Sequence, residues 1–243
     1  AAAPGVAPAA APAAKLATAC APATAQAQSA TSALVGSAVM NIDGRQVELR
    51  YGPGEDFESP ADFFSPCHPE WEAAYEGMLW WLEERGLLKD LPLDAQSVLH
   101  VGLPFCGSVP EIPGLARFLA AQVLAKVGPR GIRLFGTDVR DWGGGHGYWA
   151  EKVKFVRRKY GPAIAAEFQQ WDLAVAPPPS NGLTLAIHPE VTGGTAPWDR
   201  ILANVLGSCT GVCIIATFRE DEMEVTRAIC QGLGASVEVC ENP

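Results

Sequence analysis

The sequence predicts an α/β fold with a doubly wound, mainly parallel sheet, extended at the N-terminus by a hairpin and a helix. From residue 97 onward, apolar runs of strand length alternate with helical patterns up to the C-terminus. These runs are short and apolar throughout, as expected for strands that helices cover on both faces. With 243 residues, 48% of them hydrophobic, the chain can bury a core of this kind.

Residues 1–37 form a low-complexity leader. Sixteen of the first thirty residues are Ala and four are Pro, and Lys15 is the only charged residue before Asp43. An acid-free segment rich in Ala, Ser and Thr resembles an organellar targeting segment, and its shortage of Arg favours a plastid over a mitochondrion. A plain linker is the alternative. Because such a segment buries little by itself, we expect it to bind a subunit of a larger assembly, with a photosynthetic complex as one candidate.

Residues 38–93 are expected to form a hairpin, a loop and a Trp-rich helix. The hairpin spans Ala38–Tyr51 and turns at Asp43-Gly44, a strong signal for a two-residue turn. The helix spans Pro69–Arg85, where apolar residues recur at helical spacing. Its apolar face packs on the main domain or, alternatively, meets a partner.

Residues 94–243 are interpreted as one Rossmann-like domain. Strands are expected at residues 97–101, 132–137, 166–171, 183–187, 212–217 and 235–240. Helices are expected at residues 112–127, 148–160, 198–206 and 221–233. The strand Ser97–Val101 is expected at a central position in the sheet. In such sheets ligands bind beyond the carboxyl ends of the strands.

Three strand ends carry a resemblance to a known family. Val98–Gly102 stands where a first strand enters a glycine-rich loop, and Asp138 and Asp172 follow the second and third strands. In this arrangement residues 97–240 resemble the Rossmann-like S-adenosylmethionine-dependent methyltransferases. The resemblance implies that Asp138 binds the ribose hydroxyls of S-adenosylmethionine and that Asp172 lies near its adenine. The closing pair of strands in that family is represented here only by residues 235–240.

The loop after the first strand departs from the family pattern. His100 stands in place of an acidic residue, and Pro104 and Cys106 stand in place of two glycines. Proline has no N–H to donate and cannot adopt a positive φ, and Cys106 carries a Cβ where the backbone must approach the ligand. Gly107 would restore the turn in part. The candidate cofactor-binding residues are His100, Gly102, Cys106, Gly107, Asp138 and Asp172, in a loop that we expect to be impaired.

His188 and Glu190 are the candidate catalytic residues, because they follow the fourth strand of the domain. A histidine beside a carboxylate at a strand end suits general acid–base chemistry. The alternative is that His188 caps the strand and bonds a backbone carbonyl.

A basic cluster lies on the helix expected at residues 148–160, against a net charge of −9 for the chain. Its members are Lys152, Lys154, Arg157, Arg158 and Lys159. The cluster could bind an acidic protein face or an anionic lipid surface, and an ordinary solvated helix face is the alternative. The acidic balance of the whole chain argues against nucleic acid as the main partner.

Other classes of site find little support in the sequence. No apolar run approaches the roughly 18 residues of a membrane span, although peripheral membrane association stays open. The seven cysteines include no CxxC pair, and we interpret Cys209 and Cys213 as small apolar core residues, with a zinc or disulfide role as the alternative. No metal site is predicted.

Two functions remain open at this point. The altered loop favours a methyltransferase-like domain that serves as a structural or assembly subunit. Asp138, Asp172 and the His188–Glu190 segment favour an active S-adenosylmethionine-dependent methyltransferase.

Overall fold

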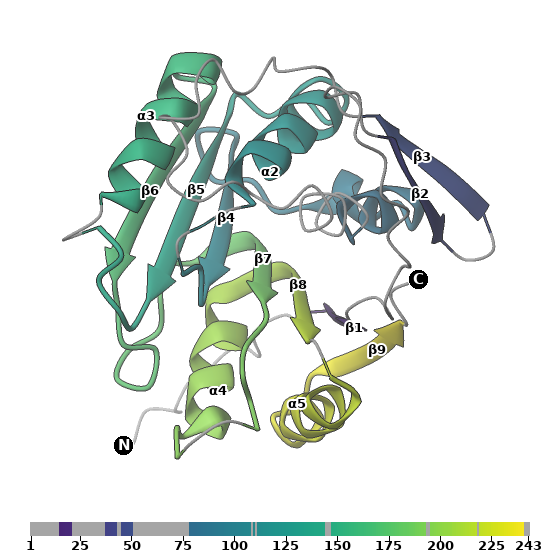
Figure 1. Ribbon diagram of the computed structural model, residues 1–243, viewed down its shortest axis with the longest axis vertical. Coiled ribbons are helices and arrows are strands. Elements are labelled where there is room, and N and C mark those ends of the chain that lie inside the picture. The colour runs from purple at the N-terminus through teal and green to yellow at the C-terminus, as the bar shows by residue number, and fades with distance from the viewer. Residues whose placement is uncertain are drawn as a thin grey trace, which may run out of the picture.

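The computed structural model describes residues 15–20, 37–42, 45–50 and 78–240, apart from 108, 110, 144–146, 193–194 and 218. Its main feature is a seven-stranded sheet in the order β6-β5-β4-β7-β8-β1-β9. Every paired neighbour in this sheet is parallel (Figure 1). The strands are β1 Lys15–Cys20, β4 Val98–Pro104, β5 Gly131–Asp138, β6 Ile164–Gln170, β7 Asn181–Ile187, β8 Cys209–Thr217 and β9 Ser236–Cys240.

All six strands expected in the main domain are present, and the predicted α/β fold is confirmed. β4 lies inside the sheet between β5 and β7, as predicted for the first strand of the domain, and β7 occupies the exact centre. Leu99, Val101 and Leu103 alternate along β4 and are each at most 1% exposed, because that face of the strand lies in the core.

Helices cover the two faces of the sheet and form two separate cores. They are α2 Ile112–Phe118, which continues as a π-helix over Leu119–Leu124, α3 Tyr148–Tyr160, α4 Trp198–Ser208 and α5 Glu220–Gly232. One core joins α2 and α3 to β4 and β5, and the other joins α4 and α5 to β8. Cys209, Cys213 and Cys230 are free, buried thiols in the second core.

The N-terminal hairpin pairs as expected. β2 Ser37–Ile42 and β3 Arg45–Arg50 form a separate antiparallel two-stranded sheet, with Ile42 opposite Arg45. The turn residues Asp43 and Gly44 lie outside the described residues.

The Trp-rich helix packs on its own domain. Residues 78–84 are helical, a short 3-10 helix follows over Leu87–Asp90, and the earlier part of the predicted helix lies outside the described residues. Leu79 and Leu82 are at most 2% exposed in the core of α2 and α3, and the Trp80 ring meets Phe118 edge-on. The packing alternative thus holds for this stretch.

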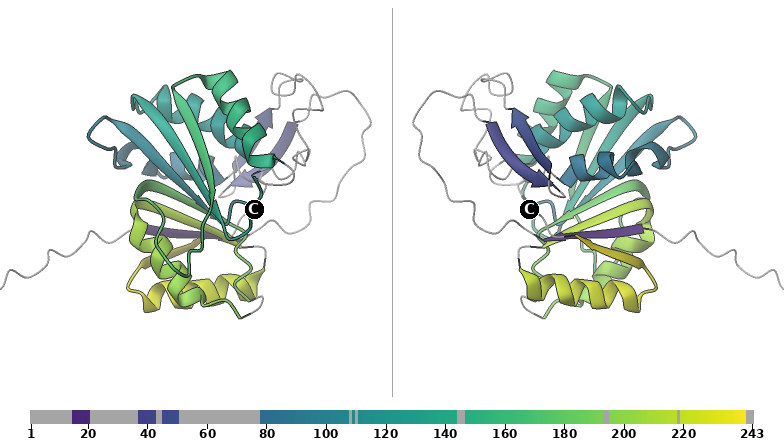
Figure 2. Two further views of the ribbon diagram at one scale, coloured as in Figure 1. Left: turned by 90° about the vertical axis from the view of Figure 1, so that its left-hand side faces the viewer. Right: turned by 90° about the vertical axis from the view of Figure 1, so that its right-hand side faces the viewer.

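The leader corrects one expectation. Its residues Lys15–Cys20 form β1, which pairs with β8 on one side and β9 on the other (Figure 2, purple strand). This part of the leader therefore belongs to the chain's own sheet and is not an extended arm for a neighbouring subunit. The physical reason is that Pro12 and Pro22 lie outside the strand, so every residue of β1 can donate its N–H to the ladder.

Candidate functional site

The loop at the carboxyl end of β4 begins later than expected. β4 runs to Pro104, beyond the predicted end at Val101, and Gly102 pairs with Phe135 inside the sheet. A Cβ on Gly102 would lie 2.6 Å from Asn181 Nδ2, so a glycine is needed there for the approach of Asn181. Gly102 is thus a packing position within a strand, and the loop starts at Phe105.

The loop is held by hydrogen bonds to the rest of the domain. The N–H of Cys106 donates to the carbonyl of Thr137 at 3.0 Å, and the N–H of Gly107 donates to Asp138 Oδ2 at 3.0 Å. Trp149 Nε1 donates to the carbonyl of Gly107 at 2.8 Å. Trp149 is buried and stacks on Phe168 with ring centroids 6.3 Å apart. The turn is therefore fixed by contacts from β5 and α3.

Asp138 uses both carboxylate oxygens within the protein. Oδ2 accepts the N–H of Gly107, and Oδ1 accepts the N–H of Arg140 at 2.8 Å. The carbonyl of Asp138 also accepts the N–H of Trp171 at 2.8 Å, which joins the ends of β5 and β6. The structure therefore brings Asp138, Cys106 and Gly107 together.

A buried ionisable cluster lies beneath the loop. Glu111, 4% exposed, stands at the start of α2. Burial raises the pKa of its carboxyl to about 7, although a backbone hydrogen bond and the charge of Lys152 both act to lower it. Burial, together with the charges of Glu111 and Asp138, raises the pKa of the Cys106 thiol well above its usual value. The Cys106 thiol therefore stays protonated at physiological pH.

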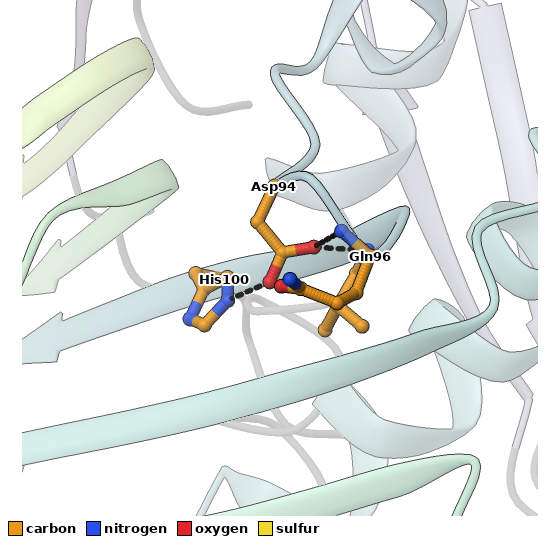
Figure 3. Close-up of polar contacts among 4 residues, drawn as sticks. Asp94, Gln96 and His100 are labelled. Atoms are coloured by element: carbon orange, nitrogen blue, oxygen red, sulfur yellow. Dashed lines mark hydrogen bonds and ion pairs between the residues drawn. The ribbon is translucent and has the colours of Figure 1, made fainter.

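His100 lies apart from the loop. Its Nε2 lies 2.8 Å from Asp94 Oδ2 (Figure 3), and the N–H groups of Gln96 and Val98 donate to the other oxygen of Asp94. The hydrogen bond from His100 is the largest of the effects that lower the pKa of the Asp94 carboxyl. Four residues of strand, roughly 13 Å, separate His100 from Pro104 at the carboxyl end. The structure therefore does not bring His100 to Asp138.

Asp172 lies in a tight turn after β6. Its Oδ1 accepts the N–H of Ala174 at 2.9 Å, and the side chain is exposed. Trp171, just before it, is tied to the end of β5, so Asp172 stands at the same edge of the sheet as Asp138.

His188 and Glu190 follow β7 at that edge. His188 has φ 55, and its N–H donates to the carbonyl of Ala216 at 2.8 Å. Burial lowers the pKa of the His188 imidazole to about 4, so the ring is neutral at physiological pH and a weak base. Glu190 is exposed, beyond a buried Pro189.

The basic cluster on α3 is smaller than expected. Lys152 is only 4% exposed, and it faces the buried Glu111 rather than solvent. Lys154 is paired with Glu151 at 2.7 Å. Arg157, Arg158 and Lys159 remain exposed in the last turn of the helix.

A cavity of about 420 Å³ lies elsewhere, on the face of β4, β5 and β6 opposite to α2 and α3. The sequence analysis missed it. The segment that connects β6 to β7, residues 171–180, contains no helix, so no helix of the described residues covers that face. Two signals were available: the run Pro177–Pro179, which forbids a helix, and the polar residues at alternate positions of β5 and β6.

No protein-family model matches the chain, and no curated protein matches it by sequence. Among solved structures, the chain is similar to magnesium protoporphyrin IX methyltransferase from Synechocystis PCC 6803 with bound SAM, at 15% identity and a TM-score of 0.44, over 74% of this chain and 77% of that one. It is similar to a [4+2]-cyclase, SpnF, at 14% identity and a TM-score of 0.41, over 65% of this chain and 58% of the cyclase.

A third similar structure is a putative sarcosine dimethylglycine methyltransferase from Galdieria sulphuraria, at 13% identity and a TM-score of 0.38, over 60% of this chain and 48% of that one. At identities and TM-scores of this size, no activity is transferred from these proteins to this chain.

Two further findings bound the site within the described part of the chain. No helix there is long and apolar enough to cross a membrane. No group of three His, Cys, Asp or Glu residues in the same ranges could hold a metal ion.

Proposed function

We propose that this chain is a methyltransferase-like domain that does not bind S-adenosylmethionine at physiological concentrations and serves as a structural subunit of a larger assembly. The observation that supports it most is the state of Asp138, whose two carboxylate oxygens accept backbone N–H groups of Gly107 and Arg140. In the family that the sequence resembles, this acid is expected to bind the ribose hydroxyls.

Ribose binding at Asp138 would cost the chain these internal contacts. Hydrogen bonds to an ionised carboxylate are among the stronger ones in proteins. A ribose hydroxyl that displaced the N–H of Gly107 would leave that half-buried donor without its acceptor, at a cost of about 1–3 kcal/mol. The gain from the new hydrogen bond would therefore be largely offset.

The shape of the loop supports the same proposal. A glycine-rich loop binds a cofactor because its backbone can approach the ligand closely and point its N–H groups at it. Here Cys106 carries a buried side chain at the turn, and the carbonyl of Gly107 is already bonded to Trp149. The buried Glu111 lies under the same loop and adds an acidic group there.

The assembly role rests on surfaces away from this loop. Arg157, Arg158 and Lys159 form an exposed cationic turn on a chain whose net charge is −9. We propose that this turn orients the domain on an acidic protein surface, where complementary charge raises the association rate more than the affinity. The composition of the leader supports a plastid, and a photosynthetic complex, as the setting; peripheral association with an anionic membrane is the variant of this proposal.

An active S-adenosylmethionine-dependent methyltransferase is the second candidate. It is favoured by backbone strain at the carboxyl edge of the sheet, where Phe105, Val109 and His188 have φ values of 61, 53 and 55. Non-glycine residues in this region are uncommon, a β-branched one especially so, and they gather at functional sites. In this candidate Asp138 and Asp172 hold the cofactor and His188 and Glu190 act on the methyl acceptor.

Titration calorimetry with S-adenosylmethionine separates the two candidates. We expect no saturable heat for the full chain, nor for Asp138→Ala, at cofactor concentrations up to about 1 mM. At that concentration even a site with a dissociation constant of about 10 μM would be nearly filled, and its occupancy would stabilise the fold by about 2.7 kcal/mol. The matched control is Glu224→Gln, on the exposed ion pair with Arg227 in α5. Saturable binding that Asp138→Ala abolishes and Glu224→Gln leaves intact would overturn the proposal and favour the enzyme.

A further inference from the structure

We propose that the open face of β4, β5 and β6 binds a small organic monocarboxylate with an aromatic body. This site is separate from the loop at the carboxyl end of the sheet, because Cys106, Gly107, Asp138, Asp172 and His188 do not line the cavity. The inference therefore does not depend on whether the chain binds S-adenosylmethionine.

The floor of the cavity is a regular array of side-chain positions. The register of the three strands places residues in three rows, and all of them line the cavity. The rows, written from β4 through β5 to β6, are His100–Arg133–Ala165, Gly102–Phe135–Glu167 and Pro104–Thr137–Gln169. Because side chains alternate along a strand, Arg133, Phe135 and Thr137 point to the same face.

The walls come from the segment before β7, from the first residue of β7 and from α4. Pro178, Pro179 and Asn181 line the cavity, and so do Val205 and Ser208 of α4. Asn181 is 5% exposed, and it bonds the carbonyl of Pro179 and the hydroxyl of Thr184. The cavity therefore has a fixed wall that does not need a ligand to form.

Arg133 is the anchor that selects the charge of the ligand. It is exposed toward the cavity and has no hydrogen-bond or ion-pair partner among residues 78–240 as described. Of the other ionisable lining residues, His100 is hydrogen-bonded to Asp94 and Glu167 accepts a hydrogen bond from Gln169. A guanidinium matches a carboxylate through two parallel N–H···O bonds.

The charge balance favours a monoanion over a phosphate. The lining offers a single fixed positive charge, with Glu167 in the neighbouring row, on a chain of net charge −9. A phosphate monoester would bring nearly two negative charges into this setting. A carboxylate needs only the one cation that the array provides.

Aromatic and hydroxyl groups define the rest of the ligand. Phe135 lies next to Arg133 along the face, and its ring meets Trp171 edge-on with centroids 6.3 Å apart. Thr137, 1% exposed, lines the far end of the cavity, and its hydroxyl has no hydrogen-bond partner in the described structure. A buried hydroxyl of this kind costs free energy unless a ligand or water bonds it.

The length and volume set the size of the ligand. Arg133 and Thr137 are four residues apart on one strand, roughly 13 Å. A cavity of about 420 Å³ is within the range of small-molecule sites. The array therefore fits a carboxylate at Arg133, a flat apolar body over Phe135 and a hydrogen-bonding group near Thr137.

Titration calorimetry with two matched probes tests the proposal on the full chain. The probes are 2-naphthoate and 2-naphthylmethanol, which share a ring system and differ in charge. We expect 2-naphthoate to bind saturably, with roughly tenfold weaker binding in Arg133→Gln. We expect no change in the control Arg157→Gln on α3 or in Thr137→Val, because this probe has no second polar group to bond the hydroxyl. We also expect 2-naphthylmethanol to bind at least roughly tenfold more weakly than 2-naphthoate.

Three results would overturn the proposal. They are no saturable binding of 2-naphthoate, equal binding of the acid and the alcohol, and binding that Arg133→Gln leaves unchanged. The comparison of the acid with the alcohol on the unaltered chain keeps the test valid if Arg133→Gln does not fold.

Discussion

At the scale of single residues, Gly102 shows how a sequence motif and its structural role can differ. In the sequence it matches the first glycine of a cofactor loop, but in the structure it lies inside β4 and faces Asn181. The glycine is required by the approach of a neighbouring side chain, a contact between residues far apart in the chain that no local pattern encodes. By contrast, Asp138 could be predicted, because an acid directly after a buried strand marks the carboxyl edge.

Gly102→Ala is predicted to destabilise the fold by about 1–3 kcal/mol, because the new Cβ would lie 2.6 Å from Asn181 Nδ2. The control is Gly207→Ala in α4, where nothing lies within 4 Å of the new Cβ. That change is expected to stabilise the helix by about 0.5–1 kcal/mol. Urea unfolding followed by tryptophan fluorescence measures both. Equal effects of the two substitutions would contradict the role given to Gly102.

Glu111 is predicted to make stability depend on pH. Burial raises the pKa of its carboxyl from 4.5 to about 7, so the folded state holds this proton more tightly than the unfolded state does. The stability that comes from protonating Glu111 in the folded state is complete below pH 4.5 and is lost as the pH rises to about 7. At 1.36 kcal/mol per pH unit this loss is at most about 3 kcal/mol, and the attraction of Lys152 is already included in that pKa.

Unfolding free energies of the parent and Glu111→Gln, compared between pH 4.5 and 7.5, test this dependence. We expect the parent to lose stability relative to Glu111→Gln as the pH rises, because Gln carries no charge at any pH. The exposed control Glu224→Gln should follow the parent. Parallel profiles for the parent and Glu111→Gln would show that Glu111 titrates normally.

At the scale of elements, the sequence defines α3 well because glycines bound it. Gly147 and Gly161 have φ values of 67 and 56, and the helix runs from Tyr148 to Tyr160, the range that the pattern predicts. β1 could not be predicted, because its small residues show no strand pattern. Its position between β8 and β9 is decided by pairing with two strands about 200 and 220 residues away in the chain.

Thr18→Pro is predicted to destabilise the sheet by about 3 kcal/mol or more. Thr18 pairs with Ile215 of β8 and with Val239 of β9, and proline removes a donor from the interior of a sheet. The matched control Thr18→Val keeps the N–H and favours a strand, so it should leave stability nearly unchanged. Thermal unfolding followed by circular dichroism distinguishes them. If both variants unfold like the parent, β1 does not contribute to the sheet.

At the scale of the whole molecule, the chain combines a seven-stranded parallel sheet with an uneven distribution of helical cover. Helices lie on both faces of β8, whereas one face of β4, β5 and β6 is covered by no helix in the described part of the chain, because residues 171–180 cross without one. The order of strands and helices could be predicted from the alternation of apolar patterns. The open face could not, because it depends on how a short segment crosses three strands.

The exposed cationic turn of α3 is predicted to act in assembly. Changing Arg157, Arg158 and Lys159 together to Ser should lower the fraction of the chain that migrates with larger complexes in native extracts, more strongly at low salt. Lys152 is left intact because it is buried beside Glu111. Migration of both forms as the same isolated monomer would contradict the assembly role and favour the enzyme.

Amide hydrogen exchange at Gly107 and Arg140 tests most directly whether Asp138 is already occupied by the protein itself. We expect both N–H groups to be protected in the parent and to lose that protection in Asp138→Ala, since Asp138 is their acceptor. Addition of S-adenosylmethionine at about 1 mM should leave both exchange rates unchanged. Rapid exchange at both sites in the parent, or a change in their rates on addition of the cofactor, would contradict the account.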